Sequence, residues 1–279
     1  MEERRARPQQ AGFTLIEAIV VIVVAGILAT IGVDFIVKPI EGYFALSRRA
    51  ALVDAADNAL QQMSREIRQA LPNSIRVSSD QLELLHTVDG GRYRARVGDS
   101  GGDILDFSSY YTSAPDTSFD VLGPLRTKPA ADDQVVIYNI TASGTTGNDY
   151  ASAADDRGLV AATSSKSKLQ LKTTPTSPDF ARSSPEQRFF IVDGPVSYVC
   201  DSSAGTLTRH AGYTPTNTGF PTDVSALAGA IVSRHVSACG FSYQPGAGQR
   251  SGLVTLQLTL TDQGESIHLL DEVHVVNAP

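Results

Sequence analysis

Residues 12–33, GFTLIEAIVVIVVAGILATIGV, decide the class of this chain. From Phe13 to Val33 the segment is apolar, and Glu17 is its only charged residue. As an α-helix this run is roughly 31 Å long, close to the thickness of the hydrocarbon core of a bilayer. Three arginines precede it and a single lysine follows it closely, so we expect a single-pass anchor with a cytoplasmic N-terminus.

Composition excludes several classes of protein. The 279 residues, 42% hydrophobic and 19% charged, are too apolar for a disordered tail and allow one or two domains. The net charge of −7 argues against a nucleic-acid partner, which requires a basic face. Two cysteines are too few for a disulfide scaffold or a structural zinc site.

A secretory signal peptide is the alternative for the apolar run. Such a signal has an uncharged apolar core of about 7–15 residues, followed by a small-residue cleavage site. Here the run is longer, and Glu17 lies inside it. A lipoprotein signal would need a cysteine directly after the run, whereas the first cysteine is Cys200. These features favour the anchor.

The run also begins with a recognisable motif. Gly12-Phe13-Thr14-Leu15-Ile16-Glu17, after a short basic leader, resembles the type IV prepilin signature. The resemblance implies that a prepilin peptidase cleaves after Gly12 and N-methylates the new N-terminus at Phe13. It also implies that the helix assembles with other subunits into a pilus or pseudopilus. Pilins, minor pilins and secretion pseudopilins share this motif, which therefore indicates a pathway only.

Glu17 has a physical interpretation of its own. A carboxylate within a bilayer costs at least ~2.5–3.5 kcal/mol, so it usually marks a functional partner. Processing would create an amine at Phe13, which Glu17 could meet within one chain or on a neighbouring subunit. The family's accepted picture is the neighbouring subunit. The alternative is that Glu17 only extends towards the cytoplasmic interface.

The sequence predicts four segments. Residues 1–12 form the leader, 13–33 the transmembrane helix, 34–71 a continuing amphipathic helix, and 72–279 a β-rich periplasmic or extracellular domain. A seven-residue repeat along the second helix predicts a face that packs on a sheet. Pro72-Asn73 supplies the stop. The repeat consists of Leu46, Val53, Leu60 and Ile67, with Ala56, Met63 and Ala70 beside it.

After residue 73 the hydrophobic period becomes two, which is typical of strands. We predict an α+β fold in which a long N-terminal helix, transmembrane in its first half, packs on an antiparallel sheet, and the pilin architecture agrees with this. Predicted strands are 81–88, 92–97, 134–141, 187–193, 195–200, 254–260 and 266–276, with a hairpin turn at 262–265. Stretches 142–166, 173–187 and 211–224 are predicted loops, and the first and last of these are candidate recognition loops.

Cys200 and Cys239 would face an oxidising periplasm in this topology, where a disulfide is favoured. Closing that loop would contribute about 4 kcal/mol in the chain-entropy treatment. Family analogy supports a bridge near the C-terminus, and two free buried thiols are the alternative.

No catalytic constellation is convincing, and we expect neither enzyme activity, a cofactor nor a metal. Gly98-Asp99-Ser100-Gly101-Gly102 matches the surroundings of a trypsin-like nucleophile, but only His86 precedes it, so a glycine-rich hairpin loop explains it better. The remaining histidines, His210, His235, His268 and His274, lack zinc spacing. Aspartates that could supply calcium ligands lack the calcium-loop order; they are Asp99, Asp103, Asp132, Asp133, Asp155 and Asp156.

A finer resemblance to minor prepilins of the mannose-sensitive haemagglutinin (MSHA) pilus is carried by stretches within residues 40–74 and by residues 272–279; it is close over residues 12–80, weaker over the last 80 residues and lost in the loops between. It implies a structural subunit that starts or caps an adhesive pilus. The implied partners are the prepilin peptidase, major and minor pilins, membrane lipid and, indirectly, the inner-membrane assembly platform with its ATPase. The implied location is the inner membrane, then a periplasmic or cell-surface fibre. A minor pseudopilin of type II secretion and a fibre-tip adhesin remain as alternatives.

Overall fold

The computed structural model describes residues 12–32, 35, 37–99, 101–108, 115–144, 146–151, 156–174, 178–216, 219–220, 227, 229–246 and 251–279. It divides into two compact units, Met1–Ala51 and Leu52–Pro279, and the division falls inside the second helix. Residues 1–11 of the leader, Ser100 and Asp155, all used in the sequence analysis, lie outside the described residues.

Two long helices open the chain: α1 spans Leu15–Gly32 and α2 spans Lys38–Arg68. Pro39 lies in the first turn of α2, where a missing backbone N–H removes no helical hydrogen bond. The helix ends at Arg68, earlier than the predicted residue 71. After Arg68 the backbone forms hydrogen bonds with β2 instead of continuing the helix, since the Thr87 N–H donates to the Gln69 carbonyl at 3.0 Å.

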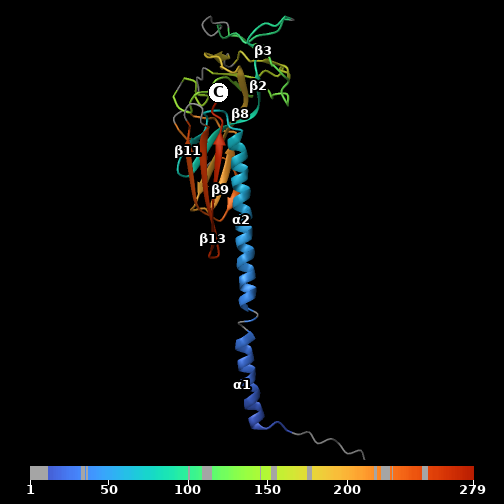
Figure 1. The fold of residues 1–279 in the computed structure, drawn as a ribbon, viewed down its shortest axis with the longest axis vertical. Helices are drawn as coiled ribbons and strands as arrows, with labels where there is room; N and C mark the ends of the chain where they lie inside the picture. Colours follow the sequence, from blue (N-terminus) through green and yellow to red (C-terminus); the bar gives the residue numbers. More distant parts are fainter. Residues whose placement is uncertain are drawn as a thin grey trace, which may run out of the picture. The chain divides into compact units, whose positions relative to one another are not determined.

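The rest of the chain forms antiparallel sheets, and this confirms the predicted α+β class (Figure 1). Among the described residues an eight-stranded sheet has the order β1-β2-β8-β4-β5-β7, with β9 between β8 and β10; β11-β12-β13 and β3-β6 form two further sheets. The strands are β1 (Arg76–Val77), β2 (Gln81–Arg92), β3 (Ser118–Asp120), β4 (Gln134–Val136), β5 (Asp156–Leu159), β6 (Lys168–Gln170), β7 (Asp179–Phe180), β8 (Arg188–Asp201), β9 (Thr206–Ala211), β10 (Ala230–Arg234), β11 (Val236–Gln244), β12 (Gly252–Asp262) and β13 (Glu265–Val275).

The main core lies between the second half of α2 and the sheets. Side chains of α2 share one buried cluster with β2, β8 and all three strands of the β11-β12-β13 sheet. The predicted repeat is only partly correct, because Leu60 and Ile67 are buried whereas Leu46 and Val53 are exposed. Ala56, Met63 and Ala70, which were predicted beside the repeat, are buried, and the buried part of α2 begins at Leu52, after the Met1–Ala51 unit ends.

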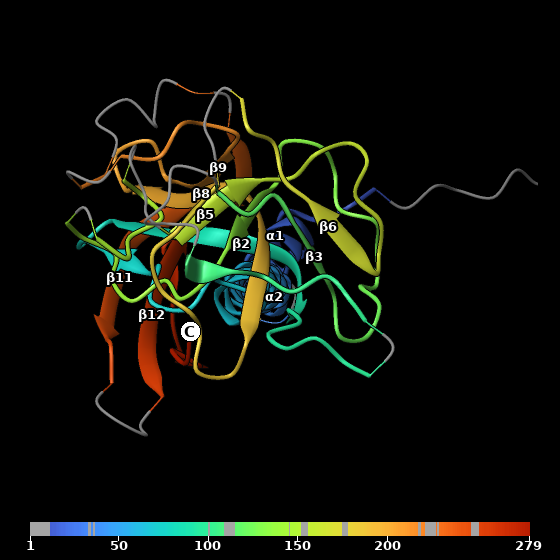
Figure 2. The same ribbon diagram turned by 90° about the horizontal axis from the view of Figure 1, so that it is seen from above.

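A second, aromatic core lies under the middle strands. Phe119 and Phe189 are fully buried, with ring centroids 5.4 Å apart in an edge-to-face arrangement. Tyr93 packs on Phe107 at the same centroid distance. Figure 2 views the molecule from above. β2 and β8 run past the end of α2, with β5 on one side of the helix in this view and β6 on the other. This cluster stabilises the short strands that alternation does not predict.

Several predicted strand and loop boundaries are wrong. The predicted strand 92–97 is absent from the described fold beyond Arg92, and residues 137–141 do not extend β4. The predicted loops 142–166 and 173–187 contain β5 and β7. β8 is one strand through Gly194, whose φ of 135° accompanies the register shift opposite His86 and Thr87. The β12–β13 hairpin is confirmed, with Gln263 and Gly264 both at positive φ in its two-residue turn.

Candidate processing site and membrane anchor

The predicted cleavage site lies directly before α1. Gly12, Phe13 and Thr14 precede the helix, which begins at Leu15. The Thr14 hydroxyl accepts a hydrogen bond from the Glu17 backbone N–H at 3.4 Å. Thr14 is therefore the N-cap, and Thr-x-x-Glu is the pattern of a capping box. The sequence analysis did not use this signal, which fixes where the helix starts.

Packing against the described part of the chain does not explain the glycine at position 12. A Cβ atom built on Gly12 meets nothing within 4 Å. Phe13 is 80% exposed and the bond between the two residues lies outside any helix.

α1 exposes an apolar surface on every side. None of its residues is buried, and Leu15 is 81% exposed. It is the one helix within the described residues that is long and apolar enough to cross a membrane. At 18 residues it is about 27 Å long. A continuous apolar surface of this kind requires lipid or other helices as its surroundings. Glu17 is its only charged residue and lies in the first turn, where the helix dipole favours a negative charge.

Cys200 and Cys239 form a disulfide, with their Cα atoms 6.3 Å apart. Cys200 belongs to β8 of the large sheet and Cys239 to β11 of the three-stranded sheet. The bond therefore links two sheets that have no other covalent connection except the chain itself.

The predicted metal and catalytic candidates are dispersed. In the described part of the chain no group of three or more His, Cys, Asp or Glu residues is placed to hold a metal ion. His86 pairs with Asp193 at 2.8 Å, and His235 with Asp262 at 3.5 Å. The Asp193 hydrogen bond raises the pKa of His86 against an opposing effect of burial.

The candidate calcium ligands are engaged separately. Asp103 pairs with Lys168 at 2.8 Å, and Asp132 with Lys172 at 2.5 Å. Asp133 accepts the Ala130 N–H at 2.8 Å. Within the protease-like pentapeptide, the Gly101 N–H donates to the Gly98 carbonyl at 2.9 Å.

The sequence analysis missed a buried ion pair. Arg76 and Glu83 lie opposite each other on β1 and β2, and the Arg76 Nε donates to a Glu83 carboxylate oxygen at 2.8 Å. The Tyr213 hydroxyl donates to the other oxygen at 2.6 Å. Burial raises the pKa of Glu83, and Arg76 opposes that shift. The Arg76 guanidinium also stacks 3.6 Å from the ring centroid of Tyr150. Arg76 and Glu83 are seven residues apart, and no sequence motif marks such a pair.

Comparison with known proteins assigns the N-terminal segment. Residues 7–33 match the family described as the prokaryotic N-terminal methylation motif. Neither the curated proteins nor the solved structures give a significant match to the chain. The chain thus carries a type IV prepilin-like methylation motif, which indicates a pilin-like or pseudopilin protein. Such a motif implies processing by a prepilin peptidase and partnership with other pilins.

Proposed function

We propose that this chain is a minor type IV pilin-like subunit of an MSHA-type adhesive pilus, similar to the minor prepilin MshO. It takes part in starting or capping the fibre. The observation that carries the proposal is the methylation motif at residues 7–33, which opens an apolar helix whose side chains are all unburied. The choice of an MSHA-type pilus rests on the resemblance of residues 12–80 and, more weakly, of the last 80 residues to MSHA minor prepilins.

The proposed organisation follows the segments of the sequence. Residues 1–12 are a leader, 13–33 cross the inner membrane with the N-terminus in the cytoplasm, α2 follows as a helix that ends at Arg68, and the rest of the chain lies in the periplasm and then in the fibre. Cleavage after Gly12 frees the amine of Phe13, which is then N-methylated. The assembly platform and its ATPase extract the subunit, so the chain itself performs no catalysis.

Glu17 is the proposed assembly contact. Its carboxylate lies in an apolar helix, where an unneutralised charge costs several kcal/mol, and the amine of a neighbouring Phe13 would neutralise it. Docking a subunit then removes an unfavourable charge from lipid, and this provides a driving force that depends on processing.

The first experiment measures the mass of the N-terminal peptide after co-expression with and without a prepilin peptidase. A mature chain that starts at methylated Phe13 only when the peptidase is present supports the proposal. An intact Met1, or cleavage beyond residue 28, contradicts it.

A second experiment separates processing from assembly. We expect Glu17→Gln to be cleaved like the parent but to be depleted from sheared fibres. Glu41→Gln, an equivalent change in the first turn of α2, is the matched control and should be incorporated. The fibre with which the chain is recovered distinguishes the two assembly systems. Recovery with an MSHA-type fibre supports the proposal, and recovery with a type II secretion pseudopilus supports the alternative. Incorporation of Glu17→Gln at the level of the parent would exclude the proposed contact.

A further inference from the structure

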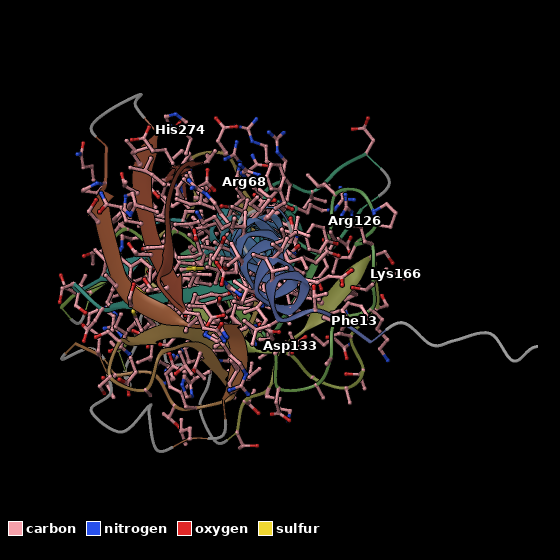
Figure 3. The ribbon with its side chains drawn as sticks, turned by 90° about the horizontal axis from the view of Figure 1, so that it is seen from below. Phe13, Arg68, Arg126, Asp133, Lys166 and His274 are labelled. Carbon is pink, nitrogen blue, oxygen red and sulfur yellow. A yellow bond between two sulfur atoms is a disulfide. The ribbon has the colours of Figure 1, made fainter. Side chains whose placement is uncertain are left out.

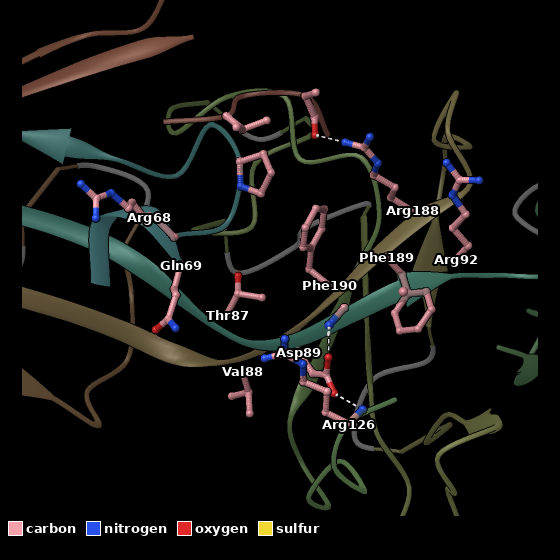
Figure 4. A pocket seen from close by; sticks show the side chains of 16 residues that line it. Arg68, Gln69, Thr87, Val88, Asp89, Arg92, Arg126, Arg188, Phe189 and Phe190 are labelled. Atoms are coloured by element: carbon pink, nitrogen blue, oxygen red, sulfur yellow. Dashed lines mark hydrogen bonds between the residues drawn. The ribbon is translucent and has the colours of Figure 1, made fainter. Parts of the chain in front are cut away.

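A pocket of about 550 Å³ in the Leu52–Pro279 unit is lined by arginines from four different elements (Figure 4). They are Arg68 at the end of α2, Arg92 at the end of β2, Arg126 in the loop after β3, and Arg188 at the start of β8. Pockets of this size hold small organic ligands. Four arginines around one pocket are unexpected in a chain with a net charge of −7.

Among the described residues, two of these guanidinium groups make weak polar contacts, and the other two make no hydrogen bond or ion pair. Arg92 meets Glu186 at 3.3 Å with both side chains more than half exposed, and Arg188 donates to the Ala278 carbonyl at 3.4 Å. Within the described residues the guanidinium groups of Arg68 and Arg126 make no hydrogen bond or ion pair. The pocket therefore holds unneutralised positive charge.

The one carboxylate among the lining residues, Asp89, offsets only part of this charge and forms no ion pair with the described arginine side chains. Asp89 accepts backbone N–H bonds from Gly90 and Arg126, each at 2.8 Å, and from Thr127 at 3.3 Å. Lys166 donates to the Arg126 carbonyl at 2.7 Å, and the two residues lie close together in Figure 3. The backbone of Arg126 is thus fixed from both sides while its side chain stays available to a ligand.

An aromatic ring supplies an apolar surface in the same pocket. Phe190 is half-buried and lies near the centre of Figure 4, with Arg68 on one side of the view and Arg188 on the other. It is paired with Gly90 across β2 and β8, and a Cβ on Gly90 would come within 3.4 Å of its ring. Glycine at that position leaves the ring accessible from the pocket.

We propose that this pocket binds a short acidic saccharide, a few sugar units that carry carboxylates. Guanidinium groups bind carboxylates through paired hydrogen bonds, and the Phe190 ring offers a surface for the apolar face of a pyranose. The volume exceeds what an inorganic anion would fill. A long acidic peptide or polysaccharide would extend over a protein surface that is negative overall, whereas a short ligand meets mainly the local arginines.

The test uses the full chain in an uncharged polyoxyethylene detergent that contains no sugar. Calorimetry measures binding of trigalacturonate, and its methyl ester is a neutral ligand of the same shape. We expect the ester to bind at least about tenfold more weakly, because it cannot accept charge-assisted hydrogen bonds. The double variant Arg68→Gln, Arg126→Gln should lose affinity to a similar extent, whereas Arg234→Gln, an exposed arginine on β10, should not.

Saturation-transfer NMR tests the aromatic contact. The parent should transfer magnetisation to the ring protons of the sugar, and Phe190→Leu should reduce that transfer while keeping an apolar side chain. Equal affinity for acid and ester, unchanged affinity of the double arginine variant, or absence of binding at millimolar trigalacturonate would overturn the proposal. Equal or tighter binding of inorganic phosphate or triaspartate would also overturn it, in favour of a general anion site or a peptide site. The assay requires neither processing nor assembly, so its outcome is independent of the proposed function.

Discussion

At the scale of single residues, the Arg76–Glu83 ion pair is almost completely removed from solvent. Glu83 is fully buried and Arg76 nearly so, with side-chain exposures of 0% and 10%. Removing one member of such a pair leaves an uncompensated charge, whereas replacing both by apolar side chains is often tolerated. The two kinds of substitution therefore have different consequences.

We expect Glu83→Gln to lower the free energy of unfolding by about 3 kcal/mol, because Arg76 keeps its charge and loses its counter-ion. The double variant Arg76→Met, Glu83→Leu should cost less than the single one. Urea denaturation followed by tyrosine fluorescence measures both, since the chain has nine tyrosines and no tryptophan. A double variant less stable than Glu83→Gln would show that the pair is net stabilising.

His86 predicts a pH dependence. Its hydrogen bond to Asp193 raises the pKa of His86 above its usual 6.5. The stabilisation is therefore complete below the unfolded-state pKa and is lost as pH rises through the higher folded-state value. We expect the melting temperature to fall slightly between pH 6 and pH 8, since the pair is partly exposed. Asp193→Asn should abolish this fall, and an unchanged slope in that variant would assign it to another group.

At the scale of elements, position along α2 decides which side chains of one repeat are buried. Ile67 is fully buried and Val53 is 38% exposed, although both belong to one seven-residue repeat. Val53 lies where the buried part of α2 begins, next to Leu52, whereas Ile67 lies well inside that part.

Ile67→Ala should therefore destabilise the protein by about 2–5 kcal/mol, the range for large-to-small core substitutions. Val53→Ala also shortens an aliphatic side chain of α2, and should cost less than about 1 kcal/mol. Urea midpoints of the two variants give the comparison. Similar losses for both would place Val53 against a partner that the structure does not provide.

The disulfide between β8 and β11 should matter more than most side-chain contacts. Its ends are 39 residues apart, so the chain-entropy treatment gives about 4 kcal/mol of stabilisation. We expect Cys200→Ala with Cys239→Ala to lower the free energy of unfolding by that order. A reductant should destabilise the parent equally and leave the double variant unaffected. Insensitivity of the parent to reductant would indicate that the bond is absent or inaccessible.

At the scale of the whole molecule, the sequence predicts the ends of the chain better than its middle. The anchor is a long apolar run, and β12 and β13 alternate over eleven residues each, so periodicity identifies them. β5 and β7 are four and two residues long, and they depend on long-range pairing and on the aromatic core. Local pattern carries no information about such contacts.

The two candidate sites differ in the same respect, since one can be predicted from the sequence and the other cannot. The motif around Gly12 is contiguous, so a short window of sequence contains all of it. The arginine pocket assembles Arg68, Arg92, Arg126 and Arg188 from positions up to 120 residues apart. The pairing of β2 with β8, the hydrogen bond between Thr87 and Gln69 beside Arg68, and the bonds that fix Arg126 bring these residues together.

The link between Cys200 and Cys239 also has a mechanical consequence. When tension is applied between the two termini, the residues enclosed by the bond cannot extend. With a sequence separation of 39, roughly 130 Å of contour length remains hidden while the bond is intact. Single-molecule stretching should therefore show a shorter full extension in oxidising buffer than in reducing buffer. A subunit held in a fibre under load would lose its fold before it lost that loop.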